Sequence, residues 1–151
     1  MEHEAEIVGV GAGSTAGGDV PAVVLAVDGE YLPIFVSADQ ARAIGLALEG
    51  EPFDRPLTHD LLVEVLTEFG GAVDRVRIDD LRDGTFYAKI DAERYDDGEP
   101  ERFVFDARPS DALAIAVRVD CRIDVTDDVL DEAGHPSDSV HFDEGDDDPD
   151  W

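Results

Sequence analysis

A chain of 151 residues is long enough for one domain with a single hydrophobic core. It has 38 acidic and 11 basic residues and a formal net charge of -27, and it contains no basic patch interleaved with aromatic residues, so its composition lacks the usual signs of a nucleic-acid-binding protein. The single cysteine excludes an intrachain disulfide, and the longest apolar runs, residues 22–27 and 112–117, are much shorter than the about 20 residues that a membrane-spanning helix needs.

The first part of the chain has the pattern of β-strands. Weak alternation over residues 5–10 predicts one strand, and the apolar run over residues 21–27 predicts another. The Gly, Ser, Thr and Ala residues at 11–19 predict a flexible loop between them. Asp28-Gly29 is a strong hairpin signal, so residues 31–36 are expected to form the returning strand.

The glycines at positions 11–16 loosely match a dinucleotide-binding fingerprint. That fingerprint needs a helix directly after it, because the helix N-terminus holds the pyrophosphate. Pro21 and the β-branched residues that follow it leave no room for such a helix. We therefore expect no organic cofactor.

Two helices are predicted next. Ser37 and Gln40 form a capping box, and the apolar residues that follow at helical spacing end at Gly50. After a loop with two prolines, Thr58 is expected to cap a second helix, which Gly70 ends.

The remaining part of the domain is predicted to be a meander followed by helices. Ser110 is expected to cap a third helix, and Thr126 a short last one. The predicted meander strands are residues 72–79, 85–95 and 101–106. The predicted fold is α+β, with a mixed or antiparallel sheet that contains hairpins and three main helices packed on it.

The end of the chain differs in composition from the rest. From Gly134 onward, Pro, Ser, Asp and Glu dominate and few residues are able to enter a core. We therefore predict one domain over residues 1–133 and an acidic, disordered tail over residues 134–151. Because the N-terminus also lacks the features of a secretory signal, we expect a cytoplasmic protein that does not contact a membrane.

The acidity of the chain is typical of a protein from a high-salt cytosol. Arginine is retained, whereas Lys89 is the only lysine. At about 1 M salt the Debye length is roughly 3 Å, so only charges in contact interact strongly. The net charge therefore does not exclude a phosphodiester substrate, although any recognition of phosphate has to be local.

Two similar junctions supply candidate chemistry. An Arg-Pro pair precedes a helix start both at Arg55-Pro56 and at Arg108-Pro109, and each helix carries an Asp in its first turn. Helix N-termini attract anions, and an arginine is able to hold a phosphate through two hydrogen bonds. These features favour a phosphate-bearing ligand.

Five sequence blocks, in this order and spacing, resemble the bifunctional nuclease domain family. The blocks are Leu32-Pro-Ile-Phe35, residues 43–50, Arg55 to Leu62, Ile78 to Tyr87 and Asp106 to Ala114. The resemblance spans residues 5 to 133. It implies a compact α+β domain, often a homodimer, with the nuclease activity on DNA and RNA that is attributed to plant members. It does not identify catalytic residues.

Our hypothesis is a metal-assisted nuclease whose substrate is DNA, RNA or both. Asp106 and Asp111 would share Mg²⁺ or Mn²⁺, Arg108 would hold a phosphate oxygen, and His59 beside Asp60 would move a proton if the two junctions meet in space. The same residues also suit helix capping and ion pairing. Two alternatives therefore remain: a non-catalytic module that binds a phosphorylated ligand or a protein partner, and an oligomeric scaffold with the junctions at its subunit interface.

Overall fold

The structure is a computed structural model of the chain, and it describes residues 1–15, 18–50 and 55–136. All but the first three residues of the predicted acidic tail lie outside the described residues.

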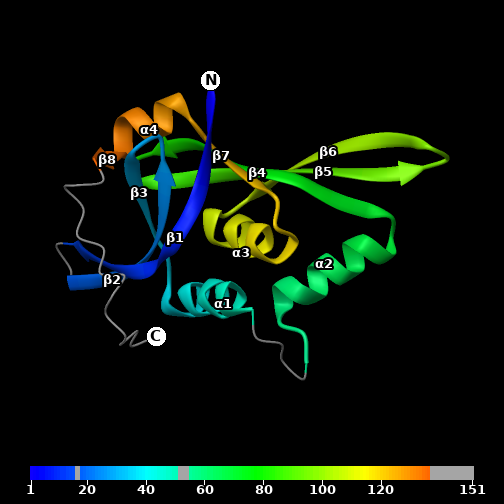
Figure 1. Cartoon of the computed structure of the whole chain (residues 1–151), viewed down its shortest axis with the longest axis horizontal. Helices are drawn as coiled ribbons and strands as arrows, with labels where there is room; N and C mark the ends of the chain where they lie inside the picture. Colours follow the sequence, from blue (N-terminus) through cyan, green and yellow to red (C-terminus); the bar gives the residue numbers. More distant parts are fainter. Residues whose placement is uncertain (16–17, 51–54, 137–151) are drawn as a thin grey trace.

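In the part of the chain that the structure describes, eight strands form one mixed sheet in the order β6-β5-β4-β7-β1-β2-β3-β8 (Figure 1). Neighbouring strands are antiparallel except β4 and β7, which are parallel. The strands are β1 (Glu2–Thr15), β2 (Gly18–Val27), β3 (Glu30–Phe35), β4 (Gly71–Arg82), β5 (Thr85–Asp96), β6 (Glu99–Ala107), β7 (Arg122–Thr126) and β8 (His135–Pro136).

Among the described residues there are four helices: α1 (Ala38–Glu49), α2 (Thr58–Glu68), α3 (Pro109–Val119) and α4 (Asp127–Ala133). α3 packs against the sheet, and α1 and α2 pack against α3 on the same side of it (Figure 1). The predicted α+β class is confirmed, with α4 in addition to the three main helices. Within the described ranges, no helix has the length and apolarity needed to cross a bilayer.

The predicted loop at residues 11–19 is wrong over most of its length. β1 and β2 continue through it as a hairpin, with Gly13 opposite Val20. Gly13 is needed there for close approach, because a Cβ atom at this position would lie 2.4 Å from the Phe35 ring. The predicted turn at Asp28-Gly29 is confirmed, since both residues have positive φ.

Among the predicted helix caps, the capping box at Ser37 and Gln40 forms the expected side-chain hydrogen bonds. The Ser37 hydroxyl accepts a hydrogen bond from the Gln40 amide at 3.1 Å, and the Gln40 side chain accepts one from the Ser37 amide at 2.7 Å. Thr58 and Ser110 are not the N-caps, because α2 and α3 begin after Leu57 and Arg108. Proline at the first position of α3 has the φ angle of a helix, so the helix starts before Ser110, which is buried.

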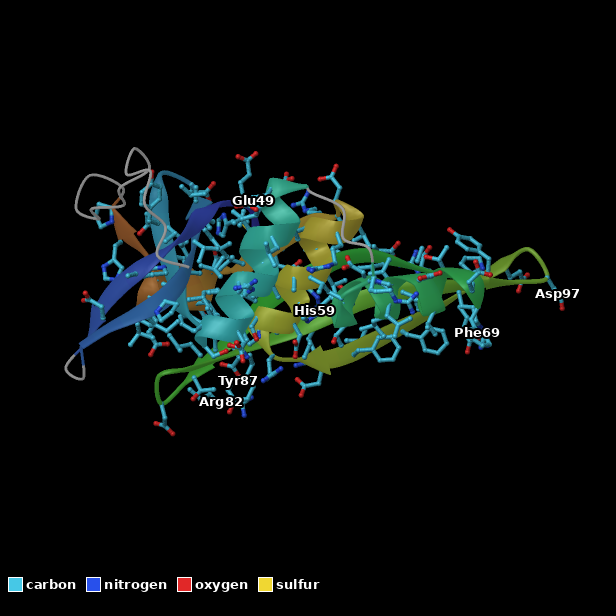
Figure 2. All side chains as sticks on the ribbon, turned by 90° about the horizontal axis from the view of Figure 1, so that it is seen from below. Glu49, His59, Phe69, Arg82, Tyr87 and Asp97 are labelled. Atoms are coloured by element: carbon cyan, nitrogen blue, oxygen red, sulfur yellow. The ribbon has the colours of Figure 1, made fainter. Side chains whose placement is uncertain are left out.

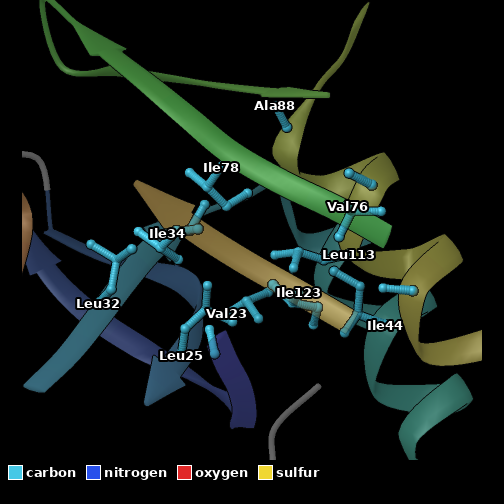
Figure 3. Packing of buried hydrophobic residues seen from close by; sticks show 14 of the residues in the cluster. Val23, Leu25, Leu32, Ile34, Ile44, Val76, Ile78, Ala88, Leu113 and Ile123 are labelled. Carbon is cyan, nitrogen blue, oxygen red and sulfur yellow. The ribbon is translucent and has the colours of Figure 1, made fainter. Parts of the chain in front are cut away.

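The core lies between the sheet and the helices α1 and α3 (Figure 3). Fully buried side chains from β2, β3, β4, α1 and α3 meet there, among them Val23, Leu25, Leu32, Ile34, Ile44, Val76, Ile78 and Leu113. α2 differs from α1 and α3, because it contributes no buried residue.

An ion-pair network lies on the part of the sheet formed by β5, β4, β7 and β1. Asp124 is fully buried and accepts hydrogen bonds from Arg75 at 2.8 Å and from Arg122 at 2.6 Å. Arg75 also donates to Glu2 and Asp91. Because a buried carboxylate is costly unless it is paired, the two arginines are what allow Asp124 to remain inside.

Replacing a core residue tests this packing. Leu113→Ala is expected to lower the free energy of unfolding by about 2–5 kcal/mol, because it leaves a cavity beneath α3. Leu48→Ala, at a position that is 43% exposed, should change it by less than about 1 kcal/mol. Denaturant unfolding in molar KCl measures both, and equal losses would contradict the assigned core.

His3 joins three parts of the domain. Its Nδ1 lies 2.5 Å from the Asp28 carboxylate in the β2–β3 turn, and its Nε2 is hydrogen-bonded to Asp127 at the start of α4. The hydrogen bond to Asp127 raises the pKa of His3, and the same bond lowers the pKa of Asp127.

These opposite shifts predict how stability depends on pH. The His3 contribution should be complete below its unfolded pKa of 6.5 and lost as the pH rises through the higher folded value. The Asp127 contribution should be present above pH 3.8 and lost in acid. The melting temperature should therefore fall more between pH 6 and pH 9 for wild type than for His3→Gln. An equal fall in the two proteins would contradict the contribution of His3.

Candidate functional site

The two Arg-Pro junctions meet in space. His59, in the first turn of α2, has its Nε2 3.0 Å from Oδ1 of Asp111, in the first turn of α3. Arg108, the N-cap of α3, donates from Nε to the other oxygen of Asp111 at 2.8 Å. Figure 2 shows His59 between the two helices. We call His59, Arg108 and Asp111 the junction site.

Asp111 is the central group of the junction site. Burial raises the pKa of its carboxyl, but the hydrogen bonds from Arg108 and His59 outweigh burial and hold the pKa below its usual value. The ionised carboxylate is only an acceptor, so Nε2 of His59 carries a proton and Nδ1 carries the free lone pair when the ring is neutral. The arrangement thus fixes both the orientation and the tautomer of the imidazole.

Arg108 is placed to reach a ligand. Its side chain is 68% exposed, and within the described part of the chain only its Nε has a hydrogen-bond partner. The hydrogen bond to Asp111 raises the pKa of the guanidinium, which is charged at all relevant pH values. The two terminal nitrogens are therefore available to bind an anion.

Asp60 has a structural position and lies in a different set of contacts. Its carboxylate accepts from the Leu57 amide at 3.0 Å, which caps α2, and from Arg118 Nε at 2.7 Å. Arg118 also donates to the carbonyl groups of Ala114 in α3 and Ala43 in α1. One buried guanidinium thus links all three helices.

Asp106 is not part of the junction site either. It is largely exposed near the end of β6, and Lys89 donates to it at 3.2 Å. Both oxygens of Asp111 are already bonded to cationic or ring nitrogens. In residues 1–15, 18–50 and 55–136, no three His, Cys, Asp or Glu side chains are grouped to hold a metal ion. The donor set does not fit the Mg²⁺ or Mn²⁺ site predicted at Asp106 and Asp111.

A groove adjoins the junction site and contains residues that the sequence analysis did not select. It has a volume of about 300 Å³ and lies where β3, the β4–β5 turn and the start of α3 come together. Its lining includes Arg108, Gln40, Thr85, Phe35 and Phe86. Both phenylalanines lie in sequence blocks that resemble the family. Nothing in the sequence indicated a role in binding for either of them.

Comparison with known proteins identifies the class. Residues 23–138 match the bifunctional nuclease domain, and the chain belongs to this family. It is 42% identical over 104 residues to uncharacterized proteins of Mycobacterium tuberculosis from strains CDC 1551 / Oshkosh and ATCC 25618 / H37Rv. The matched region is 69% of this chain and 59% of each relative.

The hydrogen bonds of Arg118, including the one to Asp60, predict that its substitution lowers stability. Arg118→Ala should lower the free energy of unfolding by roughly 1–3 kcal/mol, because it removes hydrogen bonds to α1, α2 and α3 together. Arg108→Ala, which removes an exposed ion pair, should cost less than about 1 kcal/mol. Chemical unfolding followed by circular dichroism measures both, and a larger loss for Arg108→Ala would contradict the assigned roles.

Proposed function

We propose that this protein hydrolyses phosphodiester bonds of DNA or RNA at the junction site. The observation that carries the proposal is the shared Asp111 carboxylate, which joins an oriented imidazole and an exposed guanidinium beside a groove. Membership of the bifunctional nuclease domain family supports the same reaction class.

His59 is the proposed acid and base. Its Nδ1 has no hydrogen-bond partner within the described residues, so it is free to accept a proton from an attacking water. The water oxygen forms a bond to phosphorus while its proton moves to Nδ1. The imidazolium, stabilised by Asp111, then returns this proton to the leaving oxygen as the other P–O bond breaks.

Arg108 and the groove are the proposed substrate contacts. The free nitrogens of Arg108 would hydrogen-bond the non-bridging oxygens, where negative charge gathers during the reaction. Phe35 is half-exposed and lines the groove, so it offers aromatic surface on which a nucleobase is able to stack. Both interactions act at contact range, so neither is removed by molar salt.

A binding function is the second candidate. Arg108 lies at the N-terminus of α3, where the helix dipole favours an anion, and this pairing also suits a phosphorylated ligand that is bound without being cleaved. Saturable stabilisation by such a ligand, without product, would identify this function.

Substitution of the junction site tests the proposal. Purified protein in molar KCl is mixed with labelled single- and double-stranded DNA and RNA, in Mg²⁺, in Mn²⁺ or in chelator. His59→Gln should reduce the cleavage rate by roughly 10²- to 10⁴-fold, because general acid–base catalysis is lost. Arg108→Ala should reduce it about 10²-fold, because charge stabilisation is lost.

Arg82→Ala is the matched control. Arg82 is also 68% exposed and also pairs with an aspartate, Asp80, at 2.6 Å. Its substitution should leave the cleavage rate within about twofold of wild type, with the same melting temperature as Arg108→Ala. Wild-type protein that cleaves none of these substrates, or variants that all cleave equally, would refute the proposal.

A further inference from the structure

A pocket of about 450 Å³ lies on the face of the sheet opposite α3. Its position follows from the alternation of side chains along a strand. Val76 and Ile90 are buried in the core that α3 covers, so their neighbours Arg75 and Asp91 point to the other face and line the pocket. The pocket shares no lining residue with the groove beside the junction site, so the two are separate features of the domain.

The lining of this pocket reverses the charge balance of the chain. The whole chain has 38 acidic and 11 basic residues, whereas the lining contains three arginines and two aspartates. The arginines come from three strands: Arg75 from β4, Arg102 from β6 and Arg122 from β7. We call this the arginine pocket. Three guanidinium groups gathered in so acidic a chain indicate an anion as the occupant.

Asp124 holds two of the arginines in position. This carboxylate is fully buried, and it accepts hydrogen bonds from Arg75 at 2.8 Å and from Arg122 at 2.6 Å. The two arginines are also direct neighbours across the parallel β4–β7 pair. Their guanidinium groups are therefore fixed side by side before a ligand arrives, and binding costs less side-chain entropy than it would for mobile arginines.

Several guanidinium nitrogens remain available to a ligand. Arg75 donates from Nε and Nη1, and Arg122 donates from Nε. Arg102 is 81% exposed, and its Nε lies 3.6 Å from the Glu93 carboxylate, which is beyond hydrogen-bond distance. Within the part of the chain that the structure describes, hydrogen-bond partners are lacking for Nη2 of Arg75, for Nη2 of Arg122 and for every side-chain nitrogen of Arg102.

The other lining residues indicate which kind of anion fits. Asp74 and Asp91 oppose a weakly charged anion, so a ligand with close to two negative charges is favoured. Val104 is 59% exposed and stands opposite Asp91 on the same face, which places an apolar side chain beside the charged groups. The pocket volume of about 450 Å³ lies within the range of small-molecule sites, and inorganic phosphate alone would leave much of it empty.

We propose that the arginine pocket binds a phosphate monoester of a small organic molecule. The phosphate would contact Arg75, Arg102 and Arg122, and the organic part would lie against Val104. A phosphate monoester has nearly two negative charges and three acceptor oxygens, so it is able to meet all three guanidinium groups. These contacts act at bonding distance, where molar salt screens little. The inference does not depend on the proposed catalysis.

Calorimetric titration of the full chain in 2 M KCl tests the pocket. The probes are adenosine 5′-monophosphate, ribose 5-phosphate, inorganic phosphate and adenosine. Both esters should bind at one saturable site, at least about tenfold more tightly than inorganic phosphate or adenosine. Arg102→Ala should weaken ester binding about tenfold or more, because charge-assisted hydrogen bonds are lost.

Two further variants make the test specific to the pocket. Asp74→Asn should tighten binding about two- to fivefold, because it removes a negative charge that burial and Glu93 already disfavour by raising the pKa of Asp74. Arg94→Ala is the matched control. Arg94 is an exposed arginine of the same hairpin that pairs with Glu101 at 2.7 Å and lies outside the pocket lining, so its loss should leave the affinity within about twofold of wild type.

Several outcomes would overturn the proposal. Wild-type protein that binds neither ester, or Arg102→Ala protein that is folded by circular dichroism and binds as wild type does, would refute it. Inorganic phosphate that binds as tightly as the esters would refute the assignment to an organic ester. Loss of ester binding in Arg108→Ala would place the ligand at the junction site instead, and this variant therefore separates the pocket from the proposed nuclease site.

Discussion

The position of α2 depends on the buried guanidinium of Arg118. α2 has no fully buried residue, so the bonds from Arg118 to Asp60, Ala43 and Ala114 contribute strongly to holding it beside α1 and α3. Charge-assisted hydrogen bonds of this kind are directional, and they fix the rotation of the helix as well as its distance. The first turn of α2 is thereby aimed at the first turn of α3, where His59 reaches Asp111.

Asp60 and Asp111 each lie in the first turn of a helix, but their roles differ because their partners differ. Asp60 lies next to His59 in sequence, but its carboxylate is used by the Leu57 amide and by Arg118. The Asp111 carboxylate is shared between the His59 imidazole and the exposed Arg108. From the sequence alone, both are acidic residues at the start of a predicted helix. The difference is set by which helix lies opposite each of them.

Local signals were sufficient for much of the fold. The Asp28-Gly29 turn and the Ser37 capping box are decided by residues within four positions of one another, and both were predicted correctly. The continuous β1–β2 hairpin was missed, because the close approach at Gly13 involves Phe35, which lies on another strand. For the candidate site, the sequence identified His59, Arg108 and Asp111 but placed Asp60 and Asp106 with them. Contacts between residues about 50 positions apart decided that division.

The place of β7 in the sheet has a consequence for synthesis. β7 lies between β1 and β4, so it is the strand that joins the β1–β3 segment to the β4–β6 meander. Until residue 126 has left the ribosome, no strand pairs the two segments with each other, so each segment has an unpaired strand edge. The apolar residues that each segment contributes to the core are also exposed until then. A nascent chain of this protein is therefore open to wrong pairings until nearly all of its folded domain has been made.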